Sequence, residues 1–341
     1  MTRRATIEEL ARWLRARDGF AVIGHVSPDG DAAGSCVAVA AALRAMGKRA
    51  FACLPGGMPK MFSRFAGADG VIAAGAKPPF SPETALALDV SDEGRLGEAK
   101  ALFDGCAARA ALDHHATNPG FGDVCLIDGG RAATGELALE LIEALGVPLS
   151  REMAEWLYVA ISTDSGNFSF SCTAAGTMRA AAKLIEAGAD VAELTRALYR
   201  TRSLGRTRLL GLALAGLEVS ADGRMAWARL TDEAYARAGA LREDNDGVVN
   251  YLIEIEGVEF AALAETRGAA TKFSLRSKTW LDVAEQVARP FGGGGHDRAA
   301  GCTIEAPLED ALARVLARAR DALDAGEASS AETISRNGRK R

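Results

Sequence analysis

Short apolar runs alternate with helical patterns over the first 130 residues of the chain. Continuous apolar runs of this length are typical of strands that are buried on both faces, and we expect such strands at residues 20–24, 49–54, 85–90, 109–112 and 123–128. Apolar residues recur at helical spacing over 7–14, 32–46 and 93–103, the first of these after the capping box Thr6-x-x-Glu9. This alternation predicts right-handed β-α-β connections and a mostly parallel sheet.

The pattern changes after Thr134. Helical spacing predominates over 135–145, 151–162, 174–187 and 191–217, and short strands return after the turn signal Asp222-Gly223. These later strands are expected at 225–230, 259–265, 271–276 and 302–305, with helices over 281–288 and 308–325. We therefore predict an α/β fold with a parallel-sheet domain and helical cap over 1–195, a helical connector over 196–222, a smaller α/β domain over 223–326 and a disordered tail over 327–341.

The composition is that of an ordinary globular protein, with 48% hydrophobic and 25% charged residues among 341. The formal net charge of −5 argues against a protein that coats long duplexes through positive charge. The six cysteines form no C-x-x-C pair, which favours reduced, buried thiols over a disulfide framework or a zinc knuckle. Because the chain shows neither an apolar signal segment nor a membrane span, we expect a cytoplasmic protein without a membrane partner.

One candidate group stands directly after the first predicted strand, where His25, Asp29 and Asp31 occur within seven residues. The carboxyl ends of strands in an open α/β sheet line the ligand crevice, so these side chains can converge on a small volume. Hard cations prefer oxygen ligands and borderline cations also accept imidazole, which makes a metal site one interpretation. An ordinary turn that contains a histidine is the alternative. An EF-hand is excluded, because Ala33 and Ala40 occupy positions that need oxygen ligands.

Three further groups stand where a predicted regular element ends. They are Asp89, the triplet Asp113-His114-His115 and the turn Thr163-Asp164-Ser165-Gly166. Each has a simple alternative: a lone Asp after a strand usually begins a turn, and adjacent histidines in a strand point to opposite faces. The repeated placement of Asp or His at the end of an element favours one common site over unrelated turns.

A run of four glycines at 292–295 precedes His296. A flexible linker is the alternative interpretation, but the run is short and a predicted strand follows it. A backbone without Cβ atoms can approach a phosphate or a base closely and offer N–H donors. The spacing differs from the dinucleotide pattern G-x-G-x-x-G, and the chain contains no Walker A motif.

In their order along the chain, these motifs resemble those of the DHH phosphoesterases, in the branch that carries a DHHA1 domain. The four motifs of the first domain are matched by His25-x-x-x-Asp29-x-Asp31, by Asp89, by Asp113-His114-His115 and by Thr163-Asp164-Ser165-Gly166. The segment GGGGHDRAAG at 292–301 and the segment Ser274-Leu-Arg276-Ser277 resemble the DHHA1 signature. The resemblance extends over roughly residues 20–305, nearly the whole chain apart from its tail.

The resemblance implies a phosphoesterase with two divalent cations, usually manganese, and an active site in a cleft between the domains. One cation is expected on His25, Asp29 and Asp89, and the other on Asp31, Asp89, His114 and Asp164, with Asp89 bridging. His115 is expected to contact the substrate phosphate and Asp113 to brace the site, so the predicted catalytic residues are His115, Asp113 and Asp89. Four Asp and two His without thiolate also favour Mn²⁺ over structural zinc. The expected reaction is in-line hydrolysis of a phosphate ester, without a covalent protein intermediate.

The resemblance further implies that the second domain holds the part of the nucleotide that is remote from the scissile bond. The predicted substrate-binding residues are His115, Arg276, Ser277, Gly294, Gly295 and His296. The chain departs from the family pattern at Ser165, where Thr is more frequent, and at the sequence RAAT over 131–134, which weakens the case for a substrate contact there.

Aromatic residues make up only 6% of the chain, which argues against an extended stacking platform for long single strands. Phe168, Phe170 and Phe291 lie near the motifs and could stack on one base. We interpret them as core residues instead, because a buried apolar role is the more frequent one for phenylalanine.

Within the family, the chain is most similar to the bifunctional oligoribonucleases (nanoRNases) that also dephosphorylate pAp. Its length leaves no room for the extra domains that RecJ-type exonucleases carry, and it lacks the transmembrane segments of the membrane-bound cyclic-di-AMP phosphodiesterases. Family II pyrophosphatases share the first domain but lack a second domain of the GGGGH type. We expect hydrolysis of short single-stranded RNA, dinucleotides included, to mononucleotides, together with dephosphorylation of pAp. A phosphodiesterase for cyclic or linear dinucleotides (c-di-AMP or pApA) is the alternative, and a non-catalytic nucleotide sensor is an alternative of a different class. The sequence leaves open whether the protein forms a homodimer.

Overall fold

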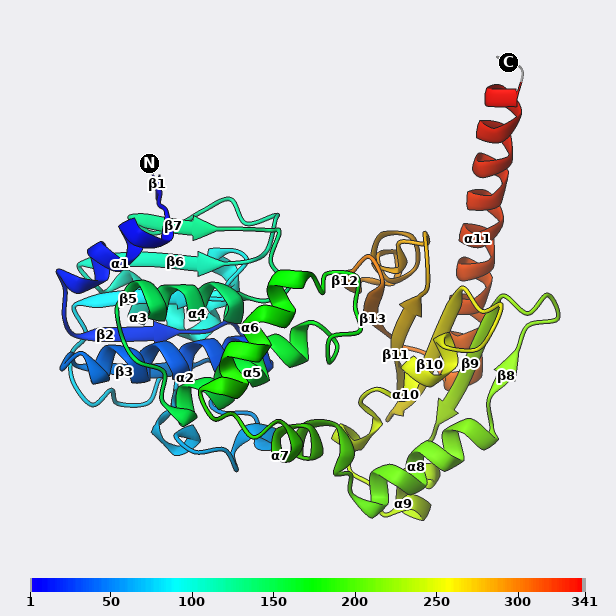
Figure 1. Ribbon diagram of the computed structural model, residues 1–341. Coiled ribbons are helices and arrows are strands. Elements are labelled where there is room, and N and C mark those ends of the chain that lie inside the picture. Colours follow the sequence, from blue (N-terminus) through cyan, green and yellow to red (C-terminus); the bar gives the residue numbers. More distant parts are fainter. Residues whose placement is uncertain (1, 339–341) are drawn as a thin grey trace. The chain divides into compact units, whose positions relative to one another are not determined.

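A computed structural model describes residues 2–338, apart from the side chains of His296 and of residues 327–338. The chain divides into two compact units, Met1–Arg200 and Thr201–Arg341. Each unit has its own sheet and its own helices (Figure 1). Within the described residues, no helix combines the length and the apolar character that crossing a membrane requires.

The described part of the first unit contains a seven-stranded sheet in the order β1-β7-β6-β5-β2-β3-β4. All of its neighbouring strands are parallel. The strands are β1 (Arg3–Arg4), β2 (Phe20–Ile23), β3 (Ala50–Leu54), β4 (Ile72–Ala73), β5 (Thr84–Leu88), β6 (Ala108–Asp113) and β7 (Val124–Ile127). Every residue of β2, β3 and β5 is buried, as expected for central parallel strands covered on both faces.

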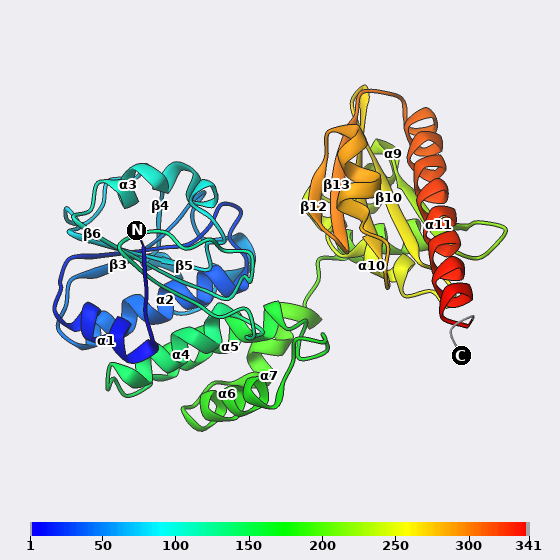
Figure 2. The ribbon, with the colours of Figure 1, turned by 90° about the horizontal axis from the view of Figure 1, so that it is seen from above.

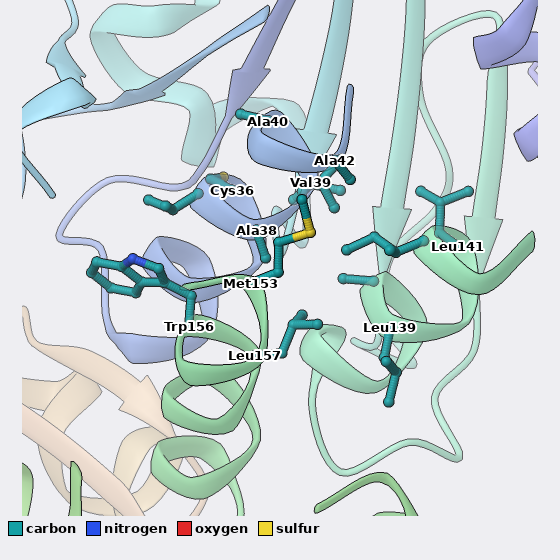
Figure 3. Packing of buried hydrophobic residues seen from close by; sticks show 14 of the residues in the cluster. Cys36, Ala38, Val39, Ala40, Ala42, Leu139, Leu141, Met153, Trp156 and Leu157 are labelled. Carbon is teal, nitrogen blue, oxygen red and sulfur yellow. The ribbon is translucent and has the colours of Figure 1, made fainter. Parts of the chain in front are cut away.

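Helices cover both faces of this sheet (Figure 2). One face carries α1 (Ile7–Arg15), α2 (Gly30–Ala45), α4 (Thr134–Ala144) and α5 (Arg151–Asp164), and the other carries α3 (Lys100–Asp104). The helices α6 (Ala175–Glu186) and α7 (Val191–Thr195) pack against α5. Side chains of α2, α4 and α5 interdigitate in the core, as Figure 3 shows around Met153 and Leu157. This core fixes the N-termini of α2 and α4 and the C-terminus of α5 near the carboxyl ends of the strands.

The sheet contains a topological switch between β2 and β5. From β2 the chain extends through β3 and β4 toward one edge, and β5 then resumes on the other side of β2. In open α/β sheets, ligands bind outside the carboxyl ends of the strands at such a point. The loops that follow β2 and β5 are therefore the expected place of a site.

The described part of the second unit contains a six-stranded sheet in the order β12-β13-β11-β10-β9-β8. Its neighbouring strands are antiparallel except for the parallel pair β9 and β10. The strands are β8 (Glu218–Val219), β9 (Met225–Leu230), β10 (Phe260–Arg267), β11 (Ala270–Ser277), β12 (Gly294–His296) and β13 (Ala299–Ile304). One face packs against α8 (Leu204–Ala215), α9 (Asp232–Ala238) and α10 (Val248–Ile253), and the other against α11 (Leu308–Gly338).

The predicted α/β class, with a parallel-sheet first domain and a smaller second α/β domain, is confirmed by these two units. The expected single helix over 191–217 is instead divided into α7, a π-helical turn (Arg196–Arg200) and α8. Helix α8 begins anew because Ser203 caps it, accepting a hydrogen bond from the backbone N–H of Arg206. The expected helix over 93–103 is a 3₁₀ segment followed by α3, with a break at Gly97, whose φ is +51°.

The C-terminal segment also differs from the expectation. A disordered tail is predicted over 327–341, whereas the backbone of α11 continues to Gly338. Residues 327–337 contain neither proline nor glycine, so nothing in that stretch ends the helix. Residues 339–341 lie outside the described part of the chain.

Candidate metal centre

The first motif lies between the carboxyl end of β2 and the start of α2. Asp29 is the N-cap residue of α2, and its Oδ1 accepts hydrogen bonds from the backbone N–H groups of Asp31 (3.0 Å) and Ala32 (3.1 Å). This cap fixes the turn that brings the Asp29 carboxylate to His25, with 3.6 Å between Oδ1 and Nε2. The other ring nitrogen of His25, Nδ1, lies 2.7 Å from the carbonyl oxygen of Val26. This contact orients the ring so that Nε2 faces the carboxylates of Asp29 and Asp89.

Asp89 follows β5 and occupies the middle of the site. Its φ is +60°, a left-handed conformation that is uncommon for a residue other than glycine. The carboxylate is buried, with Oδ2 3.4 Å from Nε2 of His25 and Oδ1 3.7 Å from Nε2 of His114. Asp89 therefore presents one oxygen to each histidine, which is the arrangement that a bridging ligand requires.

A second group of donors surrounds His114. Its Nε2 lies 3.2 Å from Oδ2 of Asp164, the last residue of α5, and 3.9 Å from Oδ2 of Asp31. Its Nδ1 lies 3.2 Å from the carbonyl oxygen of Arg131. As in His25, a backbone carbonyl lies within hydrogen-bonding distance of Nδ1, so Nε2 can act as a metal ligand.

Asp113 ends β6 and is fully buried beneath His115. Its Oδ1 accepts a hydrogen bond from Nδ1 of His115 (2.8 Å), and its Oδ2 accepts one from Nδ2 of Asn118 (2.6 Å). Asn118 is itself buried and also donates to the carbonyl oxygen of Val90 (2.9 Å). Within the described residues, Nε2 of His115 has no protein partner, so it can face a ligand. No pattern in the sequence marks an amide for this place, so Asn118 is absent from the predicted site residues.

The carboxylates of the site destabilise one another. Burial, followed by the charges of Asp89 and Asp164, raises the pKa of Asp31 well above its usual range, and burial raises the pKa of Asp164 to about 6. Burial alone would lower the pKa of His25, but the nearby carboxylates of Asp29 and Asp89 outweigh it and raise that pKa to about 10. The site therefore has an excess of negative charge that cations would neutralise.

The donor atoms fit divalent cations. Three groups of donors lie within 4.8 Å of one another, namely His25-Asp29-Asp89, Asp31-His114-Asp164 and Asp89-His114-His115. They offer carboxylate oxygens and imidazole nitrogens, the ligands that Mn²⁺ and related cations accept. Burial raises the pKa of the nearby Cys36 thiol well above its usual value, and none of these three groups includes that thiol. The structure thus brings together all six of the predicted metal ligands.

The N-terminus of α4, which is not among the predicted site residues, supports two of these carboxylates. The backbone N–H groups of Thr134 and Gly135 donate to Oδ2 (2.6 Å) and Oδ1 (2.8 Å) of Asp31, and the Thr134 hydroxyl donates to Oδ1 of Asp89 (3.0 Å). The N-cap residue Ala133 has no side-chain oxygen, so Asp31 takes the place of a cap from another helix. No local pattern could reveal this, because Asp31 and Thr134 lie 103 residues apart.

The predicted substrate-binding residues of the second unit lie on neighbouring strands. Arg276 and Ser277 end β11, and Gly294 and Gly295 belong to β12, with β13 between the two strands. Gly295 has a φ of +146°, and a Cβ there would lie 2.4 Å from the carbonyl oxygen of Ala299. Only glycine fits that position.

The Arg276 and Ser277 side chains differ in how free they are to bind a ligand. Nε of Arg276 donates to Oδ1 of Asn250 (3.1 Å), which orients the guanidinium. The Ser277 hydroxyl donates to the backbone carbonyl of Leu281 (2.6 Å) and is buried. Because the hydroxyl proton of Ser277 is already donated to this carbonyl, the hydroxyl is less free than the Arg276 guanidinium to donate to a ligand. The side chain of His296, also predicted to bind substrate, lies outside the described residues.

Comparison with known proteins identifies both units. The model of the DHH family N-terminal domain matches residues 19–161, and that of the DHHA1 domain matches residues 230–325. The chain is 34% identical over 316 residues to the bifunctional oligoribonuclease and PAP phosphatase of Thermus thermophilus, covering 92% of this chain and 93% of the relative. It is 26% identical over 303 residues to the protein of the same name from Bacillus subtilis, covering 87% and 92%.

A solved structure extends this likeness to three dimensions. An exopolyphosphatase-related protein from Bacteroides fragilis superposes with a TM-score of 0.86 at 25% identity, covering 92% of this chain and 95% of that one. The motifs predict the same family, and the family models confirm it over most of the chain. The chain therefore belongs to the DHH family of phosphoesterases and combines a DHH N-terminal domain with a DHHA1 domain.

Proposed function

We propose that the protein hydrolyses short single-stranded oligoribonucleotides, down to dinucleotides, to mononucleotides, and that it also removes the 3′-phosphate of pAp. One observation carries the proposal: the side chains of six Asp and His residues, with Asp89 between the two histidines, form overlapping groups of donors. Its support is the 34% identity over nearly the full length to a relative named for both activities. The reducing cytoplasm is the proposed location, since the six cysteines are free and five of them are buried.

The proposed centre holds two cations, with Mn²⁺ as the preferred ion. His25, Asp29 and Asp89 would hold one, and Asp31, Asp89, His114 and Asp164 would hold the other. Bound cations would supply Lewis acidity that activates water and stabilises charge on the scissile phosphate. The neutralisation of buried carboxylates also resolves how an acidic protein acts on an anionic substrate.

The remaining residues orient the substrate. Asp113 accepts the Nδ1 proton of His115 and fixes the plane of that ring, which directs Nε2 away from the protein. In the imidazolium form Nε2 can donate to a phosphate oxygen. Nε of Arg276 donates to Asn250 and Nη1 donates to the carbonyl oxygen of Leu275 (2.9 Å), and Nη2 can donate to a phosphate oxygen. The hydroxyls of Thr134 and Ser35 adjoin the carboxylates but donate their protons to Asp89 and Asp31, so the proposed attack is by water.

A substrate panel tests the proposal. Protein loaded with Mn²⁺ is offered pAp, a 5′-phosphorylated RNA dinucleotide, a long single-stranded RNA and cyclic-di-AMP. We expect fast cleavage of the first two and slow cleavage of the long strand. A preference for cyclic-di-AMP would favour the signalling phosphodiesterase, and tight binding without cleavage would favour the sensor.

A matched pair of variants ties activity to the centre. Asp89→Asn removes the charge of the proposed bridging ligand, and we expect it to abolish hydrolysis of every substrate. Asp104→Asn is the control, because Asp104 is an exposed residue of α3 that pairs with Lys100. Equal activity of the two variants would contradict the assignment of Asp89.

A further inference from the structure

We propose that Phe170 stacks on a nucleobase of the substrate, an inference that rests on the proposed function. The structure corrects the interpretation of this residue as part of the core, because 59% of its surface is exposed. The other two phenylalanines considered for base stacking, Phe168 and Phe291, already contact other side chains. Phe168 packs against Tyr158, with 5.7 Å between the ring centroids, and the guanidinium of Arg314 lies 5.5 Å from the ring centroid of Phe291.

The ring of Phe170 rests with one face on the backbone of Gly166. A Cβ built on Gly166 would lie 2.4, 2.5 and 2.6 Å from Cε1, Cζ and Cδ1, three consecutive carbons of the ring. An atom in the plane of the ring cannot be so nearly equidistant from all three, so Gly166 lies over the ring face. One face is therefore covered by the glycine, and a planar partner has the opposite, exposed face available.

The turn that carries Phe170 is tightly fixed. Gly166, Asn167 and Phe168 all have left-handed φ values, of +58°, +54° and +63°, although only the first is glycine. The turn is held by hydrogen bonds from the backbone N–H of Asn167 to the carbonyl of Ser162 (2.6 Å) and from that of Phe170 to the carbonyl of Ser165 (3.0 Å). Such unfavourable conformations cluster at functional sites, where they position a particular side chain.

The same turn begins at the metal centre. Asp164 ends α5, with its carboxylate 3.2 Å from Nε2 of His114, and Gly166 follows two residues later. The ring of Phe170 lies against Gly166, so it stands beside the end of α5 that carries Asp164. A base on the exposed face of Phe170 would thus belong to a nucleotide whose phosphate reaches the centre.

The chemistry of the ring defines the class of ligand. Every base has a π face, so stacking on a single aromatic ring tolerates any base sequence but requires a base. Phe170 would therefore favour nucleotides over sugar phosphates and inorganic phosphates. A single ring suits a mononucleotide or a dinucleotide better than a long strand.

Kinetics on a substrate pair tests this role. The substrates are pAp and its base-free analogue, 1-deoxyribose 3,5-bisphosphate, with the Mn²⁺-loaded protein. We expect Phe170→Ala to raise KM for pAp by on the order of tenfold, the size of one lost base–aromatic stack, with little change in kcat. KM for the base-free analogue should not change. Phe170→Tyr should restore the wild-type KM for pAp, and Phe170→Leu should not.

Met178→Ala is the matched control, because Met178 is a similarly exposed apolar residue (54%) on α6 of the same unit; we expect wild-type kinetics. An unchanged KM for pAp in Phe170→Ala would overturn the proposal. So would an equal loss on both substrates, since that result indicates a damaged site rather than a lost stack.

A binding measurement separates this proposal from the proposed function. Phe170→Trp places a fluorophore in the stacking position, and we expect AMP to quench its emission while ribose 5-phosphate does not. If the wild-type protein cleaves no nucleotide and AMP still quenches selectively, the proposed function fails and the stacking role stands. Equal responses to AMP and ribose 5-phosphate would overturn the stacking role whatever the activity.

Discussion

Asp89 shows how single residues shape the centre. Its left-handed backbone conformation is unfavourable, and it places the two carboxylate oxygens toward different histidines. The ligand types at the strand ends could be predicted from the sequence, because Asp and His after buried strands are visible as a pattern. Their supports, Thr134 and Asn118, could not, because each acts through a contact that only the folded chain creates.

Removing the amide of Asn118 should impair the orientation of His115. In Asn118→Ala the Oδ2 atom of the buried Asp113 loses its 2.6 Å hydrogen bond, so the carboxylate can rotate away from the histidine. We expect kcat for the RNA dinucleotide to fall by roughly 10–100-fold, the usual effect of losing such an outer partner, while affinity for Mn²⁺ is retained. Steady-state kinetics and calorimetric Mn²⁺ titration measure the two quantities. Loss of Mn²⁺ affinity together with kcat would contradict this separation of roles.

Thr134 should matter for the metal rather than for the substrate. Thr134→Val keeps the shape and the backbone N–H but removes the hydroxyl that donates to Asp89 at 3.0 Å. We expect affinity for Mn²⁺ to fall by roughly 10-fold or more, as measured by calorimetry, with Thr134→Ser retaining wild-type affinity. If the Thr134→Val and Thr134→Ser variants bind Mn²⁺ equally well, the Thr134 hydroxyl does not support the metal ligand Asp89.

At the scale of elements, the alternation of apolar runs and helical patterns was sufficient to predict the central strands and the main helices. It missed β1 and β4, two-residue strands that exist only through pairing at the sheet edges. It also missed β12, because a glycine run carries no strand signal of its own and pairs only through its backbone. The helix α10 is short and follows Gly247 in a left-handed conformation, so helical periodicity had too few residues to appear.

The close contact of α2 and α5 depends on Gly34. A Cβ at that position would lie 2.3 Å from the backbone carbonyl oxygen of Trp156, so Gly34→Ala must push the helices apart. We expect a loss of about 1–3 kcal/mol in the free energy of unfolding of the first unit, measured by urea denaturation. Gly176→Ala on α6 is the control, because its Cβ would meet no atom within 4 Å; alanine should leave stability unchanged or raise it slightly. Equal effects of the two substitutions would contradict the proposed helix contact.

At the scale of the whole molecule, the net charge of −5 gains a structural meaning. Part of that negative charge belongs to Asp31, Asp89 and Asp164, which lie around two histidines in a largely buried centre. The four histidines of the chain all fall within the predicted motifs. The order of those motifs was sufficient to predict the family and the two-domain organisation. The individual hydrogen bonds of the centre required the structure.

Removal of metal should destabilise the first unit. Without cations the buried carboxylates repel one another, and a ligand present at about 100 times its Kd adds roughly 2.7 kcal/mol of stability. We expect Mn²⁺ to raise the melting temperature of EDTA-treated protein, and Asp89→Asn to reduce that increase. Differential scanning calorimetry measures both. An identical increase in wild type and variant would indicate that the ion binds elsewhere.

The most direct test of the central claim is the rate at which AMP is released from a 5′-phosphorylated adenosine dinucleotide during Mn²⁺ titration of EDTA-treated protein. The wild-type protein should be inactive at first and gain activity as Mn²⁺ is added, while Asp89→Asn stays inactive at every concentration. Release of AMP by Asp89→Asn at the wild-type rate, or no release by the Mn²⁺-saturated wild-type protein, would contradict the assignment of this centre as the site of hydrolysis.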